Sequence, residues 1–298
     1  MKKYVLIFPA LFALAMFVNG CSKRQPVVAT ETATPKMATE EIQRTFQIRP
    51  NSSVDVHFFD GSVEIQTTDS DTAEVHIIRT ARYESDLKDE PIYQIEYEEY
   101  KGESDEMKGH SFLDIRGRKT SGFEFSKAWK LFKKNPEIRS QVTLKIPRKI
   151  SYVGVGDING DVSIGEVEGG VSVGDVNGKV AIARAEGVLQ LIDINGKVDA
   201  AIAKVQNKED HFLNIINISG NVDLKFLDTI NATIAGERVN GLVTNSLPNV
   251  SVKNDKNGNY NAVIGTGGVA IKFSRIRGNT SLTPTNNLAV VSVSQREK

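Results

Sequence analysis

The 298-residue sequence holds a single cysteine, Cys21, and a single tryptophan. One cysteine cannot form a disulfide within the chain, which excludes a disulfide-stapled scaffold. The 37 basic residues are balanced by 37 acidic ones, so that the formal net charge is zero. A chain without excess positive charge lacks the electrostatic signature of nucleic-acid binding. We therefore expect neither a disulfide framework nor a nucleic-acid partner.

Long apolar runs are also missing. The apolar run at 4–18 is broken by Pro9 and is shorter than the roughly 20 apolar residues of a membrane-spanning helix. It follows Met1-Lys2-Lys3, and its length and basic flank are typical of a secretory signal peptide. The sequence therefore predicts a signal peptide over residues 1–20.

The segment Val18-Asn19-Gly20-Cys21 resembles a bacterial lipobox. The resemblance implies that Cys21 receives acyl chains such as palmitate and becomes the first residue of the mature chain. Several acyl chains on one residue make a stable membrane anchor. Ser22 follows where an aspartate would favour the inner membrane, so the resemblance implies the outer membrane in a bacterium that has two. The alternative is an ordinary signal peptide with an incidental cysteine.

Composition divides the remaining chain. Residues 21–44 are rich in alanine, threonine and proline without a clear period, which predicts a flexible tether behind the lipidated cysteine. Residues 45–282 are expected to form the folded body, and residues 283–298 a C-terminal tail. Short alternating runs at 54–58, 63–65 and 75–78 are separated by Asp and Gly, which is the pattern of strands joined by turns.

Residues 83–140 form a more charged insert within this body. Segments 92–97 and 112–116 have the pattern of a strand pair, and 125–134 has that of a short helix with Trp129 on its apolar face. The helix has two possible roles: a cap over the end of a β core, or a basic helix at lipid headgroups. The cap is preferred because so short a helix needs a packed face.

The most informative stretch repeats every 18 residues. Its unit is Asp-x-Asn-Gly, and three copies begin at Asp157, Asp175 and Asp193. Glycine recurs every nine residues, at positions 160, 169, 178, 187 and 196. A fixed period is typical of repeat architectures, and we expect Asn-Gly to supply the positive φ of each corner. Alternation directs one apolar set into a common interior: Val162, Ile164, Val171, Val173, Val180 and Ile182.

The predicted fold class is all-β, specifically a single-chain β-solenoid of 18-residue coils. Two nine-residue halves make one coil, and coils stack as parallel strands about 4.8 Å apart. An antiparallel meander or propeller blade is the rival, because Asn-Gly between alternating runs is also a hairpin signal. The solenoid is preferred because a meander gives no reason for a constant nine-residue interval.

Over residues 46–282 the chain resembles a bacterial family of unknown function known as putative adhesins. The resemblance rests on the opening strands, the 142–147 run, the Asn-Gly-x-Val repeats, and Gly-Thr-Gly-Gly at 265–268 before Gly-Asn-Thr-Ser-Leu at 278–282. It implies a glycine-punctuated β-solenoid on a secreted or lipid-anchored chain, with an adhesin-like role. Such a resemblance transfers a fold better than a function. The charged insert departs from the family pattern.

The sequence contains no recognisable catalytic or cofactor-binding motif, and we predict no enzyme activity, no metal and no cofactor. The four histidines, His57, His76, His110 and His211, lack metal-ligand spacing. His57 and His76 lie on predicted strands and could face each other, but the preferred interpretation is that they are half-exposed strand residues.

The repeated aspartates are the remaining candidate site. In an 18-residue coil Asp157, Asp175 and Asp193 would form a column with a spacing of about 4.8 Å. Such a column could hold a cation or supply the paired carboxylates of a glycosidase. The preferred interpretation is that the aspartates cap turns beside the asparagines two positions later.

These observations predict a lipid-anchored, non-catalytic envelope protein whose solenoid surface binds a glycan or a protein partner. One alternative is a carbohydrate-active enzyme on a β-helix, which would require two acids with separated pKa values on one face. The other is a periplasmic envelope-maintenance or stress factor.

Overall fold

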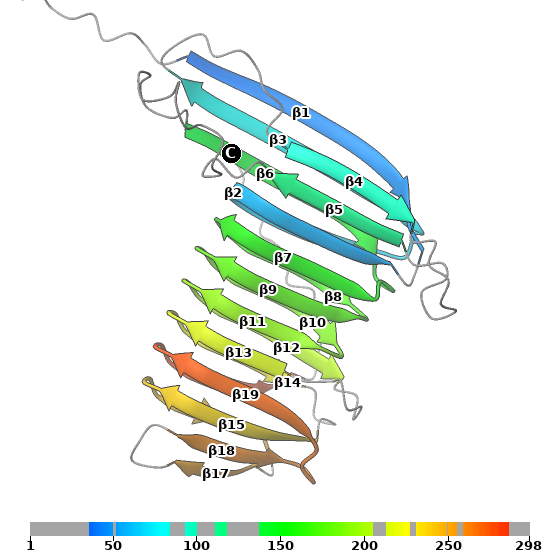
Figure 1. Cartoon of the computed structure of the whole chain (residues 1–298). Helices are drawn as coiled ribbons and strands as arrows, with labels where there is room; N and C mark the ends of the chain where they lie inside the picture. The colour runs from blue at the N-terminus through cyan, green and yellow to red at the C-terminus, as the bar shows by residue number, and fades with distance from the viewer. Residues whose placement is uncertain are drawn as a thin grey trace, which may run out of the picture. The chain divides into compact units, whose positions relative to one another are not determined.

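The computed structural model describes residues 36–49, 52–83, 93–99, 111–117, 137–204, 213–226, 231–248, 250–254 and 259–285. These residues form strands and turns and contain no helix (Figure 1). By its contacts the chain separates into residues 1–34 and 35–298, and everything described belongs to the second unit. The predicted signal peptide, Cys21 and the helix predicted at 125–134 lie outside the described residues.

Among the described residues, six strands precede the repeats. They are β1 (Lys36–Gln47), β2 (Ser53–Thr68), β3 (Thr72–Tyr83), β4 (Tyr93–Glu99), β5 (Ser111–Gly117) and β6 (Glu137–Pro147). The repeat region contains β7 (Tyr152–Asn159), β8 (Val162–Val167), β9 (Gly170–Val176), β10 (Val180–Glu186), β11 (Leu189–Ile194) and β12 (Val198–Lys204). The remaining strands are β13 (Leu213–Ile218), β14 (Val222–Phe226), β15 (Ala232–Val239), β16 (Val243–Asn245), β17 (Val250–Asn254), β18 (Tyr260–Ile264), β19 (Val269–Ile276) and β20 (Thr280–Pro284).

Hydrogen bonds arrange these strands in two ladders that are joined by the long strand β2. Sheet A runs β1, β3, β6, the second half of β2, β8, β10, β12, β14, β20, β16. Sheet B runs β4, β5, the first half of β2, β7, β9, β11, β13, β19, β15, β18, β17. In this spatial order, all pairings between β6 and β16 in sheet A and between β5 and β15 in sheet B are parallel. The pairings of β1, β3 and β6 in sheet A are antiparallel. The pairing of β4 with β5, and those of β15, β18 and β17, are antiparallel in sheet B.

Residues that pair on neighbouring strands of the repeat region are 18 positions apart in the sequence, which is the period of the repeat. Val162 pairs with Val180, which pairs with Val198 in sheet A. Val153 pairs with Val171 and Leu189 follows in sheet B. The antiparallel meander is therefore wrong for residues 152–204.

The predicted interior is confirmed. All six of the expected core side chains are at most 2 % exposed: Val162, Ile164, Val171, Val173, Val180 and Ile182. Burying a Val or Ile side chain contributes about 1.5–3 kcal/mol, and parallel strands need such burial because their inward faces meet no water. The repeat therefore specifies the core directly.

The first strand changes the expected domain boundary. Strand β1 starts at Lys36, so residues 36–44, which composition assigned to the tether, belong to a strand. Ile42 is 8 % exposed and pairs with Ile77 of β3. Exposed Glu40, Glu41 and Gln43 leave this edge strand with little apolar alternation, so it shows no clear period and composition groups it with the tether. Strands β4 and β5 pair antiparallel, as predicted for 92–97 and 112–116.

The last strands are ordered differently in space and in sequence. Strand β19 lies between β13 and β15 (Figure 1). In sheet A, β20 lies between β14 and β16. The coil formed by residues 269–285 is thus inserted between two coils that precede it in the chain. We call residues 269–285 the inserted coil.

Candidate functional site

The three repeated aspartates occupy equivalent corner positions on neighbouring strands. At each of these corners the backbone of the aspartate adopts a left-handed conformation. Asp157, Asp175 and Asp193 have φ values of 54°, 53° and 57°, and Asn217 has 58°. Asp and Asn are among the few L-residues that tolerate this left-handed region. The prediction that Asn-Gly supplies the positive φ is therefore wrong for these corners. In register, one corner column contains Phe58, Asp157, Asp175, Asp193, Asn217, Arg275 and Arg238.

The repeat glycines are needed because the backbones of successive corners lie too close together for a side chain. A Cβ added to Gly178 would lie 2.2 Å from the carbonyl oxygen of Gly160, and one on Gly196 would lie 2.0 Å from that of Gly178. No side chain fits at such distances. Each Asn-Gly corner therefore stacks directly on the backbone of the coil before it.

The repeat asparagines connect the coils through a ladder of amide hydrogen bonds. Asn195 donates to Asn177 over 2.9 Å, and Asn177 donates to Asn159 over 3.0 Å. Asn159 in turn donates to a carboxylate oxygen of Asp60 over 3.0 Å. Within the described segments, no three His, Cys, Asp or Glu side chains are grouped to hold a metal ion. The geometry therefore supports a structural role for the repeated corner.

The two predicted strand histidines lie on different sheets and do not face each other. His76 of β3 lies in sheet A, where its Nε2 is 2.7 Å from Oε1 of Glu41. His57 lies on the half of β2 that belongs to sheet B. His110 and His211 are outside the described residues.

A cluster of polar side chains lies on the outer side of sheet B. Asp55 and His57 alternate with buried Val54 and Val56 on β2, and Asp114 and Arg116 alternate with buried core residues on β5. The register places Asp55 opposite Asp114 and His57 opposite Arg116. We call Asp55, His57, Asp114, Arg116 and the neighbouring Tyr152 the sheet B cluster.

Charge pairing inside this cluster is uneven. Asp114 is 2 % exposed and forms an ion pair with Arg116 through one carboxylate oxygen, while Arg116 is 52 % exposed. The other oxygen of Asp114 is buried and finds no hydrogen-bond partner among the described residues. The Nε2 atom of His57 lies 3.6 Å from Oδ1 of Asp55, which is beyond an ordinary hydrogen bond. Asp55 and His57 thus retain capacity to bind a ligand.

Glycines on the next strand make room for these side chains. A Cβ on Gly154 would lie 1.9 Å from Oδ1 of Asp55, and one on Gly156 would lie 3.0 Å from Nδ1 of His57. The carboxylate and the imidazole therefore lie over β7, where a side chain would otherwise stand. Gly174 follows Gly156 in register on β9, so the strip next to the cluster carries no side chains at these positions.

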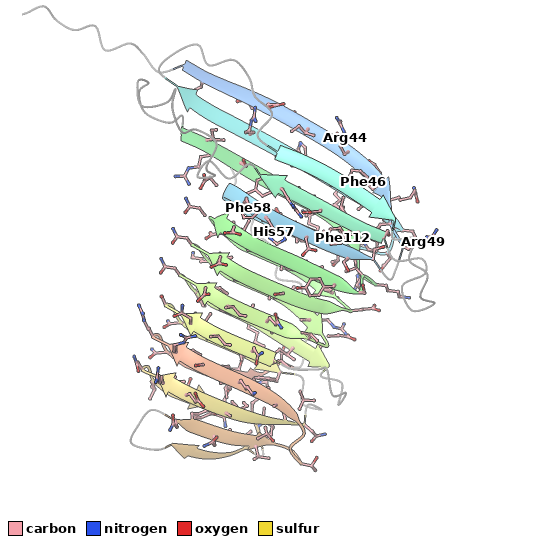
Figure 2. The ribbon with its side chains drawn as sticks, in the orientation of Figure 1. Arg44, Phe46, Arg49, His57, Phe58 and Phe112 are labelled. Atoms are coloured by element: carbon pink, nitrogen blue, oxygen red, sulfur yellow. The ribbon has the colours of Figure 1, made fainter. Side chains whose placement is uncertain are left out.

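Aromatic rings flank the cluster on both sides. His57 and Phe58 lie toward one end of the first half of β2, and Phe112 lies toward the other end, on β5 (Figure 2). The rings of His57 and Phe58 have centroids 5.9 Å apart, and Phe112 is 38 % exposed. Four strand positions separate Phe112 from Arg116, which corresponds to about 13 Å. The cluster is thus a flat, polar surface bordered by rings.

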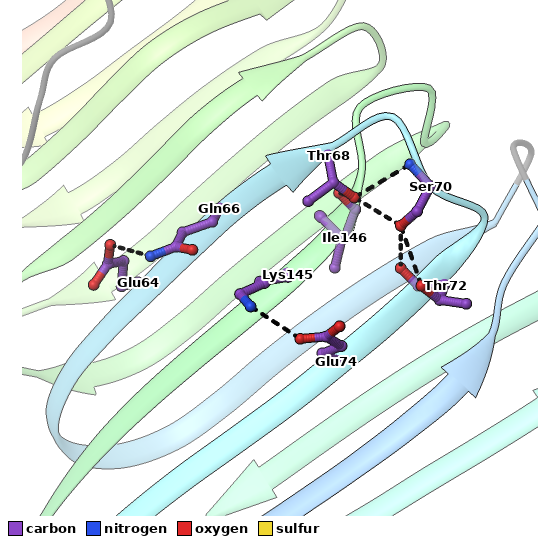
Figure 3. Close-up of polar contacts among 8 residues, drawn as sticks. All are labelled: Glu64, Gln66, Thr68, Ser70, Thr72, Glu74, Lys145 and Ile146. Carbon is purple, nitrogen blue, oxygen red and sulfur yellow. Dashed lines mark hydrogen bonds and ion pairs between the residues drawn. The ribbon is translucent and has the colours of Figure 1, made fainter.

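On and beside sheet A, several charged side chains have polar partners of their own. Figure 3 shows Lys145 paired with Glu74 over 3.0 Å, and Gln66 donating to Glu64 over 2.8 Å. Lys197 pairs with Asp223 over 2.7 Å, and this hydrogen bond raises the pKa of Lys197 above its ordinary 10.5. These mutual contacts leave less capacity for a ligand, so we place the candidate site on sheet B.

Of the cluster, the sequence singled out only His57. The Val-Asp-Val-His alternation at 54–57 indicated outward polar side chains on a strand. It could not indicate that β5, which lies beyond the charged insert, would bring Asp114 and Arg116 beside them. Cys21, the predicted lipidation site, lies outside the described residues. Over the described ranges, no helix is suited by length and apolar character to cross a membrane.

Comparisons with known proteins give structural neighbours only. No protein-family model matches the sequence. No curated protein matches it either. A putative cell adhesion protein from Clostridium sporogenes is 13 % identical, with 85 % of this chain and 100 % of that chain covered and a TM-score of 0.42. A putative adhesin from Bacteroides fragilis is 14 % identical over 83 % of this chain and 97 % of that one, with a TM-score of 0.25.

A putative adhesin from Parabacteroides merdae is 12 % identical over 83 % of this chain and 96 % of that one, with a TM-score of 0.27. Two of these three neighbours carry the name putative adhesin, as does the family that the sequence resembles. Since their TM-scores are below 0.5, the function of this chain has to be inferred from its own residues.

Proposed function

We propose that this protein is a lipid-anchored protein of the bacterial cell envelope that binds a glycan through the sheet B cluster. Acyl chains on Cys21 hold it to a membrane, and the strand stack is a β-solenoid that presents the cluster. The observation that carries the proposal is the flat polar surface of Asp55, His57 and Arg116 beside Tyr152 and a strip of glycines.

The chemistry of the cluster suits a sugar. Carboxylate and guanidinium are planar groups that form paired hydrogen bonds with adjacent hydroxyls, and imidazole adds single hydrogen bonds through its ring nitrogens. Exposed aromatic rings supply flat apolar surface against which the C–H face of a sugar ring packs. The missing side chains on Gly154 and Gly156 let the carboxylate of Asp55 and the imidazole of His57 lie over β7, which keeps this surface flat.

A protein partner fits the surface less well. Stable protein interfaces bury about 800 Å² on each side around an apolar centre. The exposed large apolar side chains among the described residues are scattered over separate strands and loops: Met37, Phe112, Leu242 and Val263. They form no common apolar centre.

Binding is favoured over catalysis because of the state of Asp114. Asp55 and Asp114 are opposite in register, which is the arrangement that the enzyme hypothesis requires. However, Asp114 is 2 % exposed and engaged by Arg116, so it cannot reach a scissile bond in this arrangement. The cluster therefore lacks a second accessible acid.

Two histidines of similar exposure allow a matched test. The mature chain with Cys21→Ser is applied to an array of bacterial and host glycans, and binding of the best glycan is then titrated. We expect His57→Ala and Arg116→Ala to weaken binding at least tenfold, and His76→Ala on sheet A to leave it unchanged. Equal affinities of the His57 and His76 variants would refute the site. Hydrolysis of the bound glycan would show that the protein is an enzyme and would refute a purely binding function.

Protease treatment of intact cells tests where the site is exposed. Loss of the protein from intact cells places it on the outer surface, in keeping with an adhesin-like role. Protection until lysis places it in the periplasm and favours envelope maintenance. A Cys21→Ala strain, in which we expect the protein to leave the membrane fraction, tests the lipid anchor.

A further inference from the structure

The inserted coil forms parallel ladders on both of its sides. Its strand β19 pairs with β13, where Ile271 lies opposite Leu213, and with β15, where Val269 lies opposite Ala232. Its strand β20 pairs with β14 and with β16. The coil therefore fills a slot whose two walls were built earlier in the chain.

The corner glycine and the left-handed corner position both continue through this coil. A Cβ on Gly278 would lie 2.3 Å from the carbonyl oxygen of Gly220, and one on Gly241 would lie 2.1 Å from that of Gly278. Arg275 occupies the corner column with a φ of 56°. The amide of Asn279 donates to Oδ1 of Asn221 over 3.0 Å. These interactions depend on the coil and the slot, and not on the segment that connects them.

The strands beyond the slot depend on the coil. In the described residues, β15 pairs only with β18 and β19, and β16 pairs only with β20. Without the inserted coil, β13 and β14 would present unpaired parallel edges, and so would β15 and β16. An unpaired edge is a template for another strand. During synthesis the slot walls exist before the coil that fills them.

The segment before the coil is a glycine-rich turn. Residues 265–268 read Gly-Thr-Gly-Gly, and the φ values of Gly265, Gly267 and Gly268 are 59°, 79° and 143°. The turn is held by the amide of Thr266, which donates to Oδ1 of Asn231 over 3.0 Å. Glycine also adopts extended conformations at little cost, so this turn can open into a hinge.

We propose that the slot is a strand-exchange site whose partner is a second copy of this chain. Residues 269–285 of each copy insert into the slot of the other, between β13–β14 and β15–β16. Each copy regains the ladders that it gives up, so concentration and the hinge set the balance between the closed and exchanged forms. The lipid anchor of the proposed function would raise the local concentration of copies, whereas the exchange itself is independent of the glycan site.

A pair of introduced cysteines reports the exchange directly. Thr244 of β16 lies opposite Ser281 of β20, at the roughly 4.8 Å spacing of neighbouring strands, which a disulfide can bridge. The chain with Cys21→Ser, Thr244→Cys and Ser281→Cys is refolded at several concentrations and oxidised. A closed chain forms the disulfide within itself, whereas an exchanged pair forms it between two chains. We expect a covalent dimer whose share rises with the concentration during refolding.

The matched control places the cysteines on strands that are not exchanged. Ser163→Cys with Ala181→Cys joins β8 to β10 at the same kind of parallel register, and this pair should stay monomeric at every concentration. Lys225→Cys with Thr283→Cys tests the exchange from the other wall of the slot. Monomeric products from both exchange pairs, or equal dimer from the control pair, would overturn the proposal. Neither outcome would affect the glycan-binding test.

Discussion

Replacing Tyr260 by phenylalanine should make the protein more resistant to alkali. Tyr260 begins β18, is 2 % exposed, and has a hydroxyl that finds no hydrogen-bond partner among the described residues. Burial raises its pKa to about 12 from the ordinary 10.0, because an ionised phenolate would lose its hydration. The folded state therefore holds this proton more tightly than the unfolded state does.

The sign of the effect follows from this difference in proton binding. Below pH 10 both states are protonated and the full stability is present. Between pH 10 and 12 the unfolded state has lost the proton and the folded state has not, so the free energy of unfolding falls as the pH rises. Two pKa units at about 1.36 kcal/mol each correspond to a loss that approaches ~2.7 kcal/mol. Phenylalanine has no such proton to lose.

Urea denaturation followed by circular dichroism measures this loss. The free energies of unfolding of the wild type and of Tyr260→Phe are compared from pH 8 to pH 12, so that titrations common to both proteins cancel. Near neutral pH the variant should equal or exceed the wild type by up to about 1 kcal/mol, because it removes a buried unpaired hydroxyl. The difference should widen by roughly 2 kcal/mol by pH 12. A constant difference across this range would refute the reasoning.

Five further substitutions, at four positions, test the repeat itself by thermal or urea denaturation. Gly178→Ala should cost about 3 kcal/mol or more, whereas Gly174→Ala, whose added Cβ would have its nearest contact at 3.6 Å, should cost less than about 1 kcal/mol. Asp175→Gly should be nearly neutral and Asp175→Val should cost about 1–2 kcal/mol, because a branched residue is strained at a φ of 53°. Glu166→Gln should cost about 1 kcal/mol and less at high salt, since Glu166 lies 2.6 Å from Arg148 and 3.9 Å from Arg184.

Periodicity and alternation are local properties, and they predicted the local part of this fold. The 18-residue spacing fixed which valines and isoleucines pair, so the core of β7 to β12 followed from the sequence. The corner chemistry was assigned to the wrong residue of the repeat, because both Asp and Gly tolerate a positive φ. Only the structure distinguished the backbone that turns at Asp175 from the backbone that stacks at Gly178.

Pairings between distant segments were not predictable in the same way. Thr280 pairs with Val222 across the intervening β15 to β18, where the 18-residue spacing is lost. Asp55 meets Asp114 only because β5 pairs with β2 at the start of the stack. Each of these pairings depends on which strands become neighbours in the sheet. A local sequence pattern does not encode the spatial order of the strands. The candidate site and the inserted coil both arise from such pairings.

The separation between these two features makes exchange compatible with binding. In sheet B the order from β2 to β19 is β2, β7, β9, β11, β13, β19, which is five strand spacings or about 24 Å. An exchanged pair would therefore keep both sheet B clusters intact and would hold two of them in one particle. Two sites that engage one polymeric glycan bind more tightly than either alone, provided that the geometry allows both to reach it. Binding of a long glycan should thus strengthen with the dimer fraction, whereas binding of a short oligosaccharide should not.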